Sequence, residues 1–120
     1  MLAVVPPPVT VRVPAKVNLH LSVADLREDG YHELVTVFQA LSLTDEVTVA
    51  VTEEPGVEVY GKGEGHVPTG EGNLAWKAVR ALAEYAGKPG AEGKVRVVLR
   101  KGIPVAGGMA GGSADAAATL

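Results

Sequence analysis

The sequence predicts an α+β fold in which helices cover a mixed sheet, and three observations lead to that prediction. Several short segments alternate valine and other apolar residues with polar ones, the pattern of half-buried strands. One later segment has both the apolar period and the end signals of a helix. A glycine-rich stretch then joins a strand to an alanine-rich helix. Because 120 residues with 47% hydrophobic content suit a single core, we expect one domain.

Alternation of apolar and polar residues predicts two strands at the start of the chain. Residues 9–13 form the first strand, and residues 16–23 form the second after Pro14 and Ala15. Successive side chains of a strand point to opposite faces, so the second strand should carry one apolar and one polar face. The apolar face would hold Val17, Leu19, Leu21 and Val23, and the polar face Lys16, Asn18, His20 and Ser22.

The next segments predict a turn, two further strands and a long loop. Residues 25–31 contain four charged residues and a glycine, which favours an exposed turn. Residues 33–43 and 47–51 are rich in β-branched residues and predict strands, with a turn at 53–56. Residues 61–72 contain five glycines and no apolar period, so they predict a surface loop.

Asn73 is placed to cap a helix that ends at Gly87 and Pro89. Its apolar stripe would contain Leu74, Ala78, Leu82 and Ala86, with Ala75, Val79 and Tyr85 beside it. Residues 94–100 alternate again and predict a strand that leads into the glycine-rich stretch. Residues 113–120 predict an alanine-rich helix without a stop signal, so we expect the sequence to be the amino-terminal part of a longer protein.

Composition excludes several classes of function. The net charge of −3 and the lack of a basic run argue against a nucleic-acid partner. A chain without cysteine has no disulfide or thiolate metal site, which fits a cytoplasmic protein. No apolar run is long enough to span a membrane, and residues 1–8 lack the features of a signal peptide. The three prolines in residues 1–8 instead predict a flexible leader, with the domain at 9–120.

The glycine-rich stretch predicts a phosphate-binding loop. It consists of Pro104, Val105, Ala106, Gly107, Gly108, Met109, Ala110, Gly111, Gly112, Ser113 and Ala114. Glycines allow positive φ angles, so successive backbone N–H groups can converge on an anion. The start of the following helix adds unsatisfied N–H donors and the positive end of its dipole. Ser113 could cap that helix, or its hydroxyl could serve a phosphate or a magnesium ion.

Other interpretations of this loop can be compared with the sequence. Small residues at a strand-to-helix connection also permit close packing, although one or two glycines would suffice for that. A P-loop NTPase requires a lysine after the second glycine, where this chain has Ser113. The dinucleotide-binding pattern G-x-G-x-x-G does not fit between Gly107 and Gly112 either, which weakens a hydride-transfer function.

Two separated motifs resemble the GHMP kinase family. The loop is similar to the family's phosphate-binding motif, and Pro14-Ala-Lys-Val-Asn-Leu19 is similar to its amino-terminal motif. Asp29-Gly-Tyr-His-Glu-Leu34, Asn73-Leu74 and Ile103-Pro104 stand in the family's order, so the resemblance spans residues 11–120. It implies the amino-terminal domain of that fold, which is like domain 2 of ribosomal protein S5.

The resemblance also implies a reaction and residues that perform it. ATP with Mg²⁺ would phosphorylate the 2-hydroxyl of a small cytidyl-diphospho-methylerythritol in isoprenoid-precursor synthesis. Lys16 corresponds to the family's active-site lysine, and Asn18 would contact the substrate. Tyr31 and His32 would hold the cytosine, and Asn73 would lie near the adenine. The histidines lack the spacing of a helical metal site, so we expect no metal bound by the protein itself.

The chain also departs from the family pattern. The family often has glycine where Ala110 stands and serine where Ala114 stands. Its catalytic aspartate lies in an Ala-Asp-Val-Pro-like segment that does not occur in these 120 residues. Asp115 lies at a helix start, where the dipole favours a negative charge without a catalytic role. We therefore expect these 120 residues to be inactive alone, and another GHMP kinase or a non-catalytic nucleotide-binding fragment remains an alternative.

Overall fold

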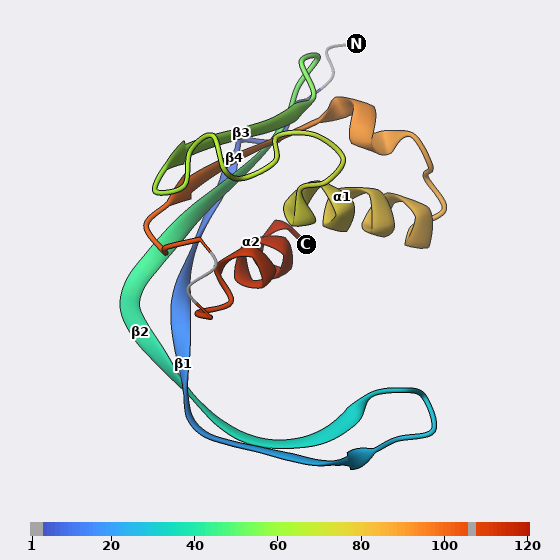
Figure 1. Ribbon diagram of the computed structural model, residues 1–120. Helices are drawn as coiled ribbons and strands as arrows, with labels where there is room; N and C mark the ends of the chain where they lie inside the picture. Colours follow the sequence, from blue (N-terminus) through green and yellow to red (C-terminus); the bar gives the residue numbers. More distant parts are fainter. Residues whose placement is uncertain (1–3, 106–107) are drawn as a thin grey trace.

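The computed structural model describes residues 4–105 and 108–120, which form a four-stranded sheet with two helices on one side (Figure 1). The elements are β1 (Val9–Leu26), β2 (His32–Val51), β3 (Gly56–Gly61), α1 (Leu74–Tyr85), the 3-10 helix η1 (Ala91–Lys94), β4 (Val95–Lys101) and α2 (Gly111–Thr119). The strand order is β1-β2-β4-β3, and only the β3–β4 pair is parallel. The mixed sheet covered by helices confirms the predicted α+β class.

The first two strands are longer than the sequence predicts. We expected a break at Pro14 and Ala15, but β1 runs through both residues. Pro14 is tolerated because β1 lies at the edge of the sheet, where a missing N–H removes no bond to a further strand. In the same way β2 joins the two strands predicted at 33–43 and 47–51.

Strand β3 was not predicted, although the turn expected at 53–56 leads directly into it. It has only six residues, and just two of them, Val57 and Val59, are buried apolar side chains. Two apolar residues are too few to establish an alternating pattern. Pairing with β4 along its whole length supplies what the local sequence lacks.

Helix α1 begins where Asn73 predicts it, because the Asn73 Oδ1 accepts a hydrogen bond of 2.8 Å from the backbone N–H of Ala75. The predicted apolar stripe is not the buried face, however, although two of the residues predicted beside it are buried. The buried residues of α1 are Ala75, Val79 and Ala83, whereas Leu74 and Leu82 remain 47% and 43% exposed. The smaller side chains allow α1 to pack closely on the sheet and on α2.

The hydrophobic core lies between the sheet and the helices. Its buried members are Val47, Val57, Val59, Ala75, Val79, Val97 and Leu99. The loop predicted at 61–72 runs along one end of this core, and Gly63, with φ of +80°, packs directly against the side chain of Val105. Residues 4–8 contain no helix or strand, and in the described part of the chain neither helix is long and apolar enough to cross a membrane.

Beyond the core, β1 and β2 continue as a two-stranded ribbon that curves around the side on which α2 lies (Figure 1). The ribbon gives the molecule a longest dimension of 58 Å, against 34 and 24 Å in the other directions. Many large apolar side chains of the ribbon are exposed, among them Leu19, Leu21, Val23, Leu34 and Phe38. The ribbon therefore extends beyond the packed part of the domain.

Candidate functional site

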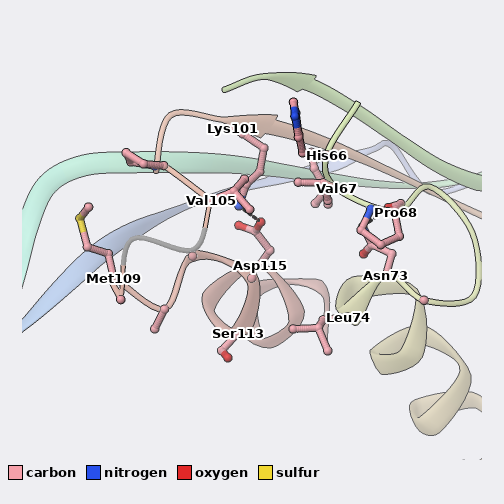
Figure 2. Close-up of a pocket in the computed structure, with 17 residues that line it drawn as sticks. His66, Val67, Pro68, Asn73, Leu74, Lys101, Val105, Met109, Ser113 and Asp115 are labelled. Atoms are coloured by element: carbon pink, nitrogen blue, oxygen red, sulfur yellow. Dashed lines mark hydrogen bonds and ion pairs between the residues drawn. The ribbon is translucent and has the colours of Figure 1, made fainter. Parts of the chain in front are cut away.

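The glycine-rich stretch and the first turns of both helices line a pocket of about 330 Å³. Figure 2 shows Val67, Pro68 and Leu74 on the side of α1, and Met109 and Ser113 on the side of the loop and α2. The pocket is thus apolar at Val67, Pro68 and Leu74, and toward α2 it is lined by the backbone of the loop, by Ser113 and, at its base, by Lys101 and Asp115. Such an arrangement suits a ligand with a flat apolar part and an anionic part.

The first turn of α2 differs from the prediction, because Ser113 is not its cap. The cap residue is Ala110, with φ of +58°, and the helix begins at Gly111. Ser113 lies in the first turn, exposed and lining the pocket. The first N–H groups of a helix have no partner within it, so Gly111, Gly112 and Ser113 can present donors to an anion. Ala106 and Gly107 of the predicted loop lie outside the described residues.

Two of the loop glycines also have a packing role. A Cβ atom on Gly111 would lie 3.1 Å from Ile103 Cγ2, and one on Gly112 would lie 3.3 Å from Leu74 Cδ1. These glycines allow α2 to approach β4 and α1 closely. Gly108 differs, because a Cβ there would meet nothing within 4 Å while its φ is +71°. Close packing therefore explains the glycines at positions 111 and 112. The positive φ angle explains the glycine at position 108.

Lys16 reaches this loop from β1. Its Nζ donates hydrogen bonds to the carbonyl of Gly108 at 2.9 Å and to Asn18 Oδ1 at 2.7 Å. Its backbone N–H donates to the carbonyl of Met109 at 3.2 Å. The ammonium also lies 5.4 Å from the centre of the Phe38 ring, within the range of a cation–π interaction. The structure thus joins the predicted lysine and the predicted loop.

The predicted polar face of this strand is wrong beyond Asn18. Asn18 pairs with Phe38, but His20 pairs with Val37, so Leu19 is an extra residue that forms a β-bulge. Adjacent residues of β2 point to opposite faces, and the bulge therefore moves His20 off the face of Lys16 and Asn18. Sequence alternation could not reveal this change, because a bulge is defined by the partner strand.

Tyr31 and His32 lie at the far end of the ribbon. The Tyr31 side chain is exposed, at 73% for the residue, and its backbone N–H donates to Asp29 Oδ1 at 3.0 Å. His32 Nδ1 lies 2.9 Å from the carbonyl of Ala24. A carbonyl only accepts, so Nδ1 carries the proton, and in the neutral ring Nε2 is an acceptor. The hydrogen bonds of both residues are to the ribbon itself, while Lys16 and Asn18 lie nearer the loop.

Sequence reasoning missed a buried cluster of three charges that borders the pocket. Lys101 Nζ donates to Asp45 Oδ2 at 2.5 Å and to Asp115 Oδ2 at 2.6 Å (Figure 2 shows Lys101 and Asp115). Asp45 Oδ1 accepts from the backbone N–H groups of Gly102 and Ile103, each at 2.8 Å. The cluster ties β2, β4 and α2 together at the base of the loop.

A signal for two of these charges was present in the alternation. Counting back by two from Val49 and Val47 places Asp45 on the buried face of β2, and counting forward from Val97 and Leu99 places Lys101 on the buried face of β4. An acid and a base at inward positions of paired strands predict an ion pair. The dipole explanation of Asp115 is wrong, because that residue is 2% exposed and bonded to Lys101.

The three ionisable groups have shifted pKa values. Burial raises the pKa of Asp115 to about 7, and the neighbouring Asp45 adds to the rise against the opposing effect of Lys101. Burial alone would raise the pKa of Asp45, but the neighbouring Asp115 and the hydrogen bonds from Lys101 and the N–H of Ile103 lower it. Burial would likewise lower the pKa of Lys101, but its bonds to Asp115 and Asp45 raise it. Asp115 Oδ1 is buried without a partner in the described part of the chain.

Comparison with known proteins agrees with this geometry. Residues 73–120 match the family model described as the GHMP kinases N terminal domain. A 4-diphosphocytidyl-2-C-methyl-D-erythritol kinase of Saccharopolyspora erythraea is 75% identical over 116 residues, 97% of this chain and 36% of that protein. The chain belongs to the GHMP kinase family. The resemblance of its two motifs to that family is thereby confirmed.

Further relatives of this GHMP kinase chain have the same name. The kinase of Rhodococcus jostii is 61% identical over the whole chain and 38% of its own length, and that of Mycobacterium tuberculosis is 58% identical over 93% of the chain and 34% of its own length. The chain therefore spans a little over a third of the length of these curated relatives.

Solved structures confirm the GHMP kinase amino-terminal fold. A crystal structure of 4-(cytidine 5'-diphospho)-2C-methyl-D-erythritol kinase matches with a TM-score of 0.69 and 45% identity, over 93% of this chain and 38% of that one. Homoserine kinase from Cytophaga hutchinsonii matches with a TM-score of 0.60 and 20% identity, over 94% of this chain and 33% of that one. At that identity the second match shows the fold alone.

Proposed function

We propose that the protein containing this chain transfers a phosphoryl group from ATP to the 2-hydroxyl of 4-diphosphocytidyl-2-C-methyl-D-erythritol, in non-mevalonate isoprenoid-precursor synthesis. The observation that carries the proposal is the 75% identity to a kinase named for that substrate. The contact between Lys16 and the glycine-rich loop supports it, because phosphoryl transfer needs a cation beside a phosphate cradle.

The loop and the first turn of α2 would hold the phosphates of ATP. Gly111, Gly112 and Ser113 present backbone N–H groups at the positive end of the helix dipole. Because these donors belong to the backbone, Ala110 and Ala114 do not impair the cradle. The apolar wall formed by Val67, Pro68 and Leu74 would then face the base of the nucleotide.

Asn73 lines the same pocket but contributes to its shape more than to recognition. Its Oδ1 caps α1, and its Nδ2 donates to the carbonyl of Pro68 at 2.7 Å. These bonds fix the loop before α1 against the helix start, and the residue is only 3% exposed. Asn73 would therefore position Pro68 and Leu74, the walls of the nucleotide site.

Magnesium would enter with ATP. In residues 4–105 and 108–120 no group of three acidic, histidine or cysteine side chains could hold a metal ion. Ser113 lines the pocket, while Asp115 is already bonded to Lys101. An ion that brings its own phosphate and water ligands, with Ser113 as an added oxygen, fits these residues. The ion would neutralise charge on the transferred phosphoryl group.

Lys16 would stabilise charge on the phosphoryl group in the transition state. Its recorded bonds are to the neutral oxygens of Asn18 and Gly108, so its positive charge is available to an anionic ligand. Asn18, on the same face of β1, would contact the substrate beside the reacting hydroxyl.

Tyr31 and His32 would hold the cytosine at the end of the ribbon. The exposed Tyr31 ring offers a face for stacking. With Nδ1–H bonded to Ala24, the Nε2 atom of His32 can accept a hydrogen bond from the 4-amino group of cytosine. The catalytic aspartate of the family would come from a segment outside these 120 residues. The whole protein would act in the cytoplasm.

The test is a phosphorylation assay on the full natural chain with ATP, Mg²⁺ and the cytidyl substrate. Homoserine and mevalonate serve as competing alcohols, and the 120-residue chain serves as a second enzyme sample. We expect the full chain to phosphorylate the cytidyl substrate and neither of the competing alcohols. We expect the 120-residue chain to show no turnover. Phosphorylation of another alcohol in preference would contradict the proposed substrate, and ATP-dependent turnover by the 120 residues would contradict the proposed origin of the catalytic aspartate.

A further inference from the structure

The bulge in β1 frees a backbone carbonyl next to the candidate site. Because Leu19 is the extra residue between the Asn18 and His20 pairings, the ladder between β1 and β2 is locally interrupted. The carbonyl of His20 instead accepts a hydrogen bond from the side chain of Thr36 in β2, with an O···O distance of 2.8 Å. A carbonyl oxygen only accepts, so the single hydroxyl hydrogen of Thr36 must point at His20.

This bond determines the direction of the next one. Thr36 Oγ1 lies 2.7 Å from Asn18 Nδ2, and with its hydrogen already used the oxygen can only accept. The amide nitrogen of Asn18 must therefore face Thr36, and its oxygen must face the other way. That oxygen accepts the 2.7 Å hydrogen bond from Lys16 Nζ. Proton donation thus runs in one direction, from Lys16 through Asn18 and Thr36 to His20.

The result is a fixed position for the Lys16 ammonium. An ammonium has three donors, and the recorded bonds direct two of them to Asn18 Oδ1 and the carbonyl of Gly108. If the Asn18 amide turned over, its NH₂ group would face the ammonium, donor against donor. The hydroxyl of Thr36 prevents this, because it offers the amide an acceptor on the opposite side.

We propose that Thr36 is a positioning residue for the candidate active site, which acts by fixing the Asn18 amide and through it the Lys16 ammonium. The predicted effect of Thr36 on turnover rests on the proposed function. The predicted effect of Thr36 on the Asn18 amide does not depend on any reaction. In the part of the chain that the structure describes, the Thr36 hydroxyl bonds Asn18 and His20 and does not bond Lys16. Its contribution is the direction of the hydrogen-bond chain.

The first test measures the side-chain NH₂ resonances of Asn18 in the full natural chain without substrate. Thr36→Val removes the hydroxyl at nearly constant shape, and Thr36→Ser retains it. Thr48→Val is the matched control, because Thr48 lies on the same strand and bonds Thr10 Oγ1 at 2.8 Å, away from Lys16. We expect Thr36→Val alone to shift the Asn18 resonances. Unchanged resonances in Thr36→Val would overturn the proposal, whether or not the protein is the proposed kinase.

The second test measures kcat, KM and thermal unfolding for the same variants. We expect Thr36→Val to lower kcat about 10-fold with KM for ATP within about 2-fold, and Thr36→Ser to restore kcat within about 3-fold. In an Asn18→Ala background, Thr36→Val should have no further effect on kcat, because its action passes through Asn18. Additive losses in that double variant would overturn the proposal. Absence of turnover in the unsubstituted chain would instead refute the proposed function, and the resonance test would still decide the role of Thr36.

Discussion

Two lysines approach the glycine-rich loop, and they differ in what surrounds the ammonium group. The Lys101 side chain is 4% exposed and lies between the carboxylates of Asp45 and Asp115. Lys16 is half-buried, and its recorded partners are a side-chain amide, a backbone carbonyl and an aromatic ring, all neutral. Within residues 4–105 and 108–120, one ammonium is therefore neutralised by carboxylates, and the other is held in place by neutral groups.

The difference indicates that the two lysines have separate tasks. A buried ion cluster is costly to break, since loss of one member leaves the others uncompensated in an apolar environment. Lys101 thus joins β2, β4 and α2 and maintains the shape of the loop. A cation held by neutral oxygens keeps its attraction for an anion, as a phosphoryl-transfer site requires. Substitution should accordingly affect stability at one lysine and activity at the other.

The largest expected effect is on the stability of Lys101→Met. This change leaves the buried carboxylate of Asp45 and the buried carboxyl group of Asp115 without their cation, and the free energy of unfolding should fall by about 3–5 kcal/mol. Chemical denaturation of the full natural chain measures the loss. Lys94→Met is the matched control, because the Lys94 side chain is 60% exposed in its pair with Glu53 and should cost below about 1 kcal/mol. Equal losses in the two variants would contradict the anchoring role of Lys101.

Lys16→Met should have the opposite profile. Loss of the cation beside the loop should lower kcat by on the order of 10²–10³-fold, as when one charge-stabilising donor is removed from an active site. The free energy of unfolding should change by less than about 1 kcal/mol, because the bonds lost are to partly exposed neutral groups. Steady-state kinetics and denaturation on one sample measure both quantities. A Lys16→Met variant with a much lower free energy of unfolding and an unchanged kcat would contradict the assignment of the two lysines.

Asp115→Asn should change how stability depends on pH. With a pKa of about 7 in the folded protein, against 3.8 ordinarily, Asp115 keeps a proton that the unfolded chain releases. The contribution of Asp115 to stability is therefore complete below about pH 4 and decreases as pH rises toward 7, by up to about 1.4 kcal/mol per pH unit.

The asparagine variant lacks this loss, so its stability relative to the original protein should increase between pH 5 and pH 8. Thermal unfolding at both pH values measures the difference. Asp25→Asn, at an exposed position of the ribbon, is the matched control for the substitution itself. A constant difference between Asp115→Asn and the original protein would contradict the proton held in the cluster.

The smallest expected effect is at the start of α2. Ala110 adopts a φ of +58°, which costs a residue with a side chain roughly 1–2 kcal/mol. Glycine avoids that cost but loses more entropy on folding, so Ala110→Gly should stabilise the protein by about 0.5–1 kcal/mol. The same substitution at Ala116, inside α2, should destabilise by about 1 kcal/mol. The melting temperature should rise in Ala110→Gly and fall in Ala116→Gly. A fall in both variants would show that the backbone of Ala110 is unstrained.

The sequence predicted the elements whose signals are local. Alternating apolar residues indicated β1, β2 and β4, Asn73 marked the start of α1, and the glycines between β4 and α2 marked the pocket. Lys16 was assigned by resemblance, and its bond to Gly108 joins two motifs separated by 92 positions. What could be predicted was thus two motifs that the structure brings into contact, at Lys16 and at the glycine-rich loop, and the order of the elements that hold them.

The remainder depends on contacts between distant segments. The bulge at Leu19 exists only in relation to β2, and it reverses the faces of β1 beyond Asn18. The buried face of α1 depends on how closely small residues let the helix approach the sheet, which hydropathy alone does not describe. Asp115 was interpreted from its place in a helix, whereas its burial follows from Asp45 and Lys101 on two strands. Each correction concerns a partner that the local sequence does not identify.

A structure of the full natural chain with a non-hydrolysable ATP analogue and Mg²⁺ tests the central claim most directly. The account predicts phosphates bound to the backbone N–H groups at the start of α2, with Lys16 Nζ within hydrogen-bond distance of the terminal phosphate. Lys101 should remain bonded to Asp45 and Asp115. Phosphates bound to Lys101, or bound away from the glycine-rich loop, would contradict the division of tasks between the two lysines.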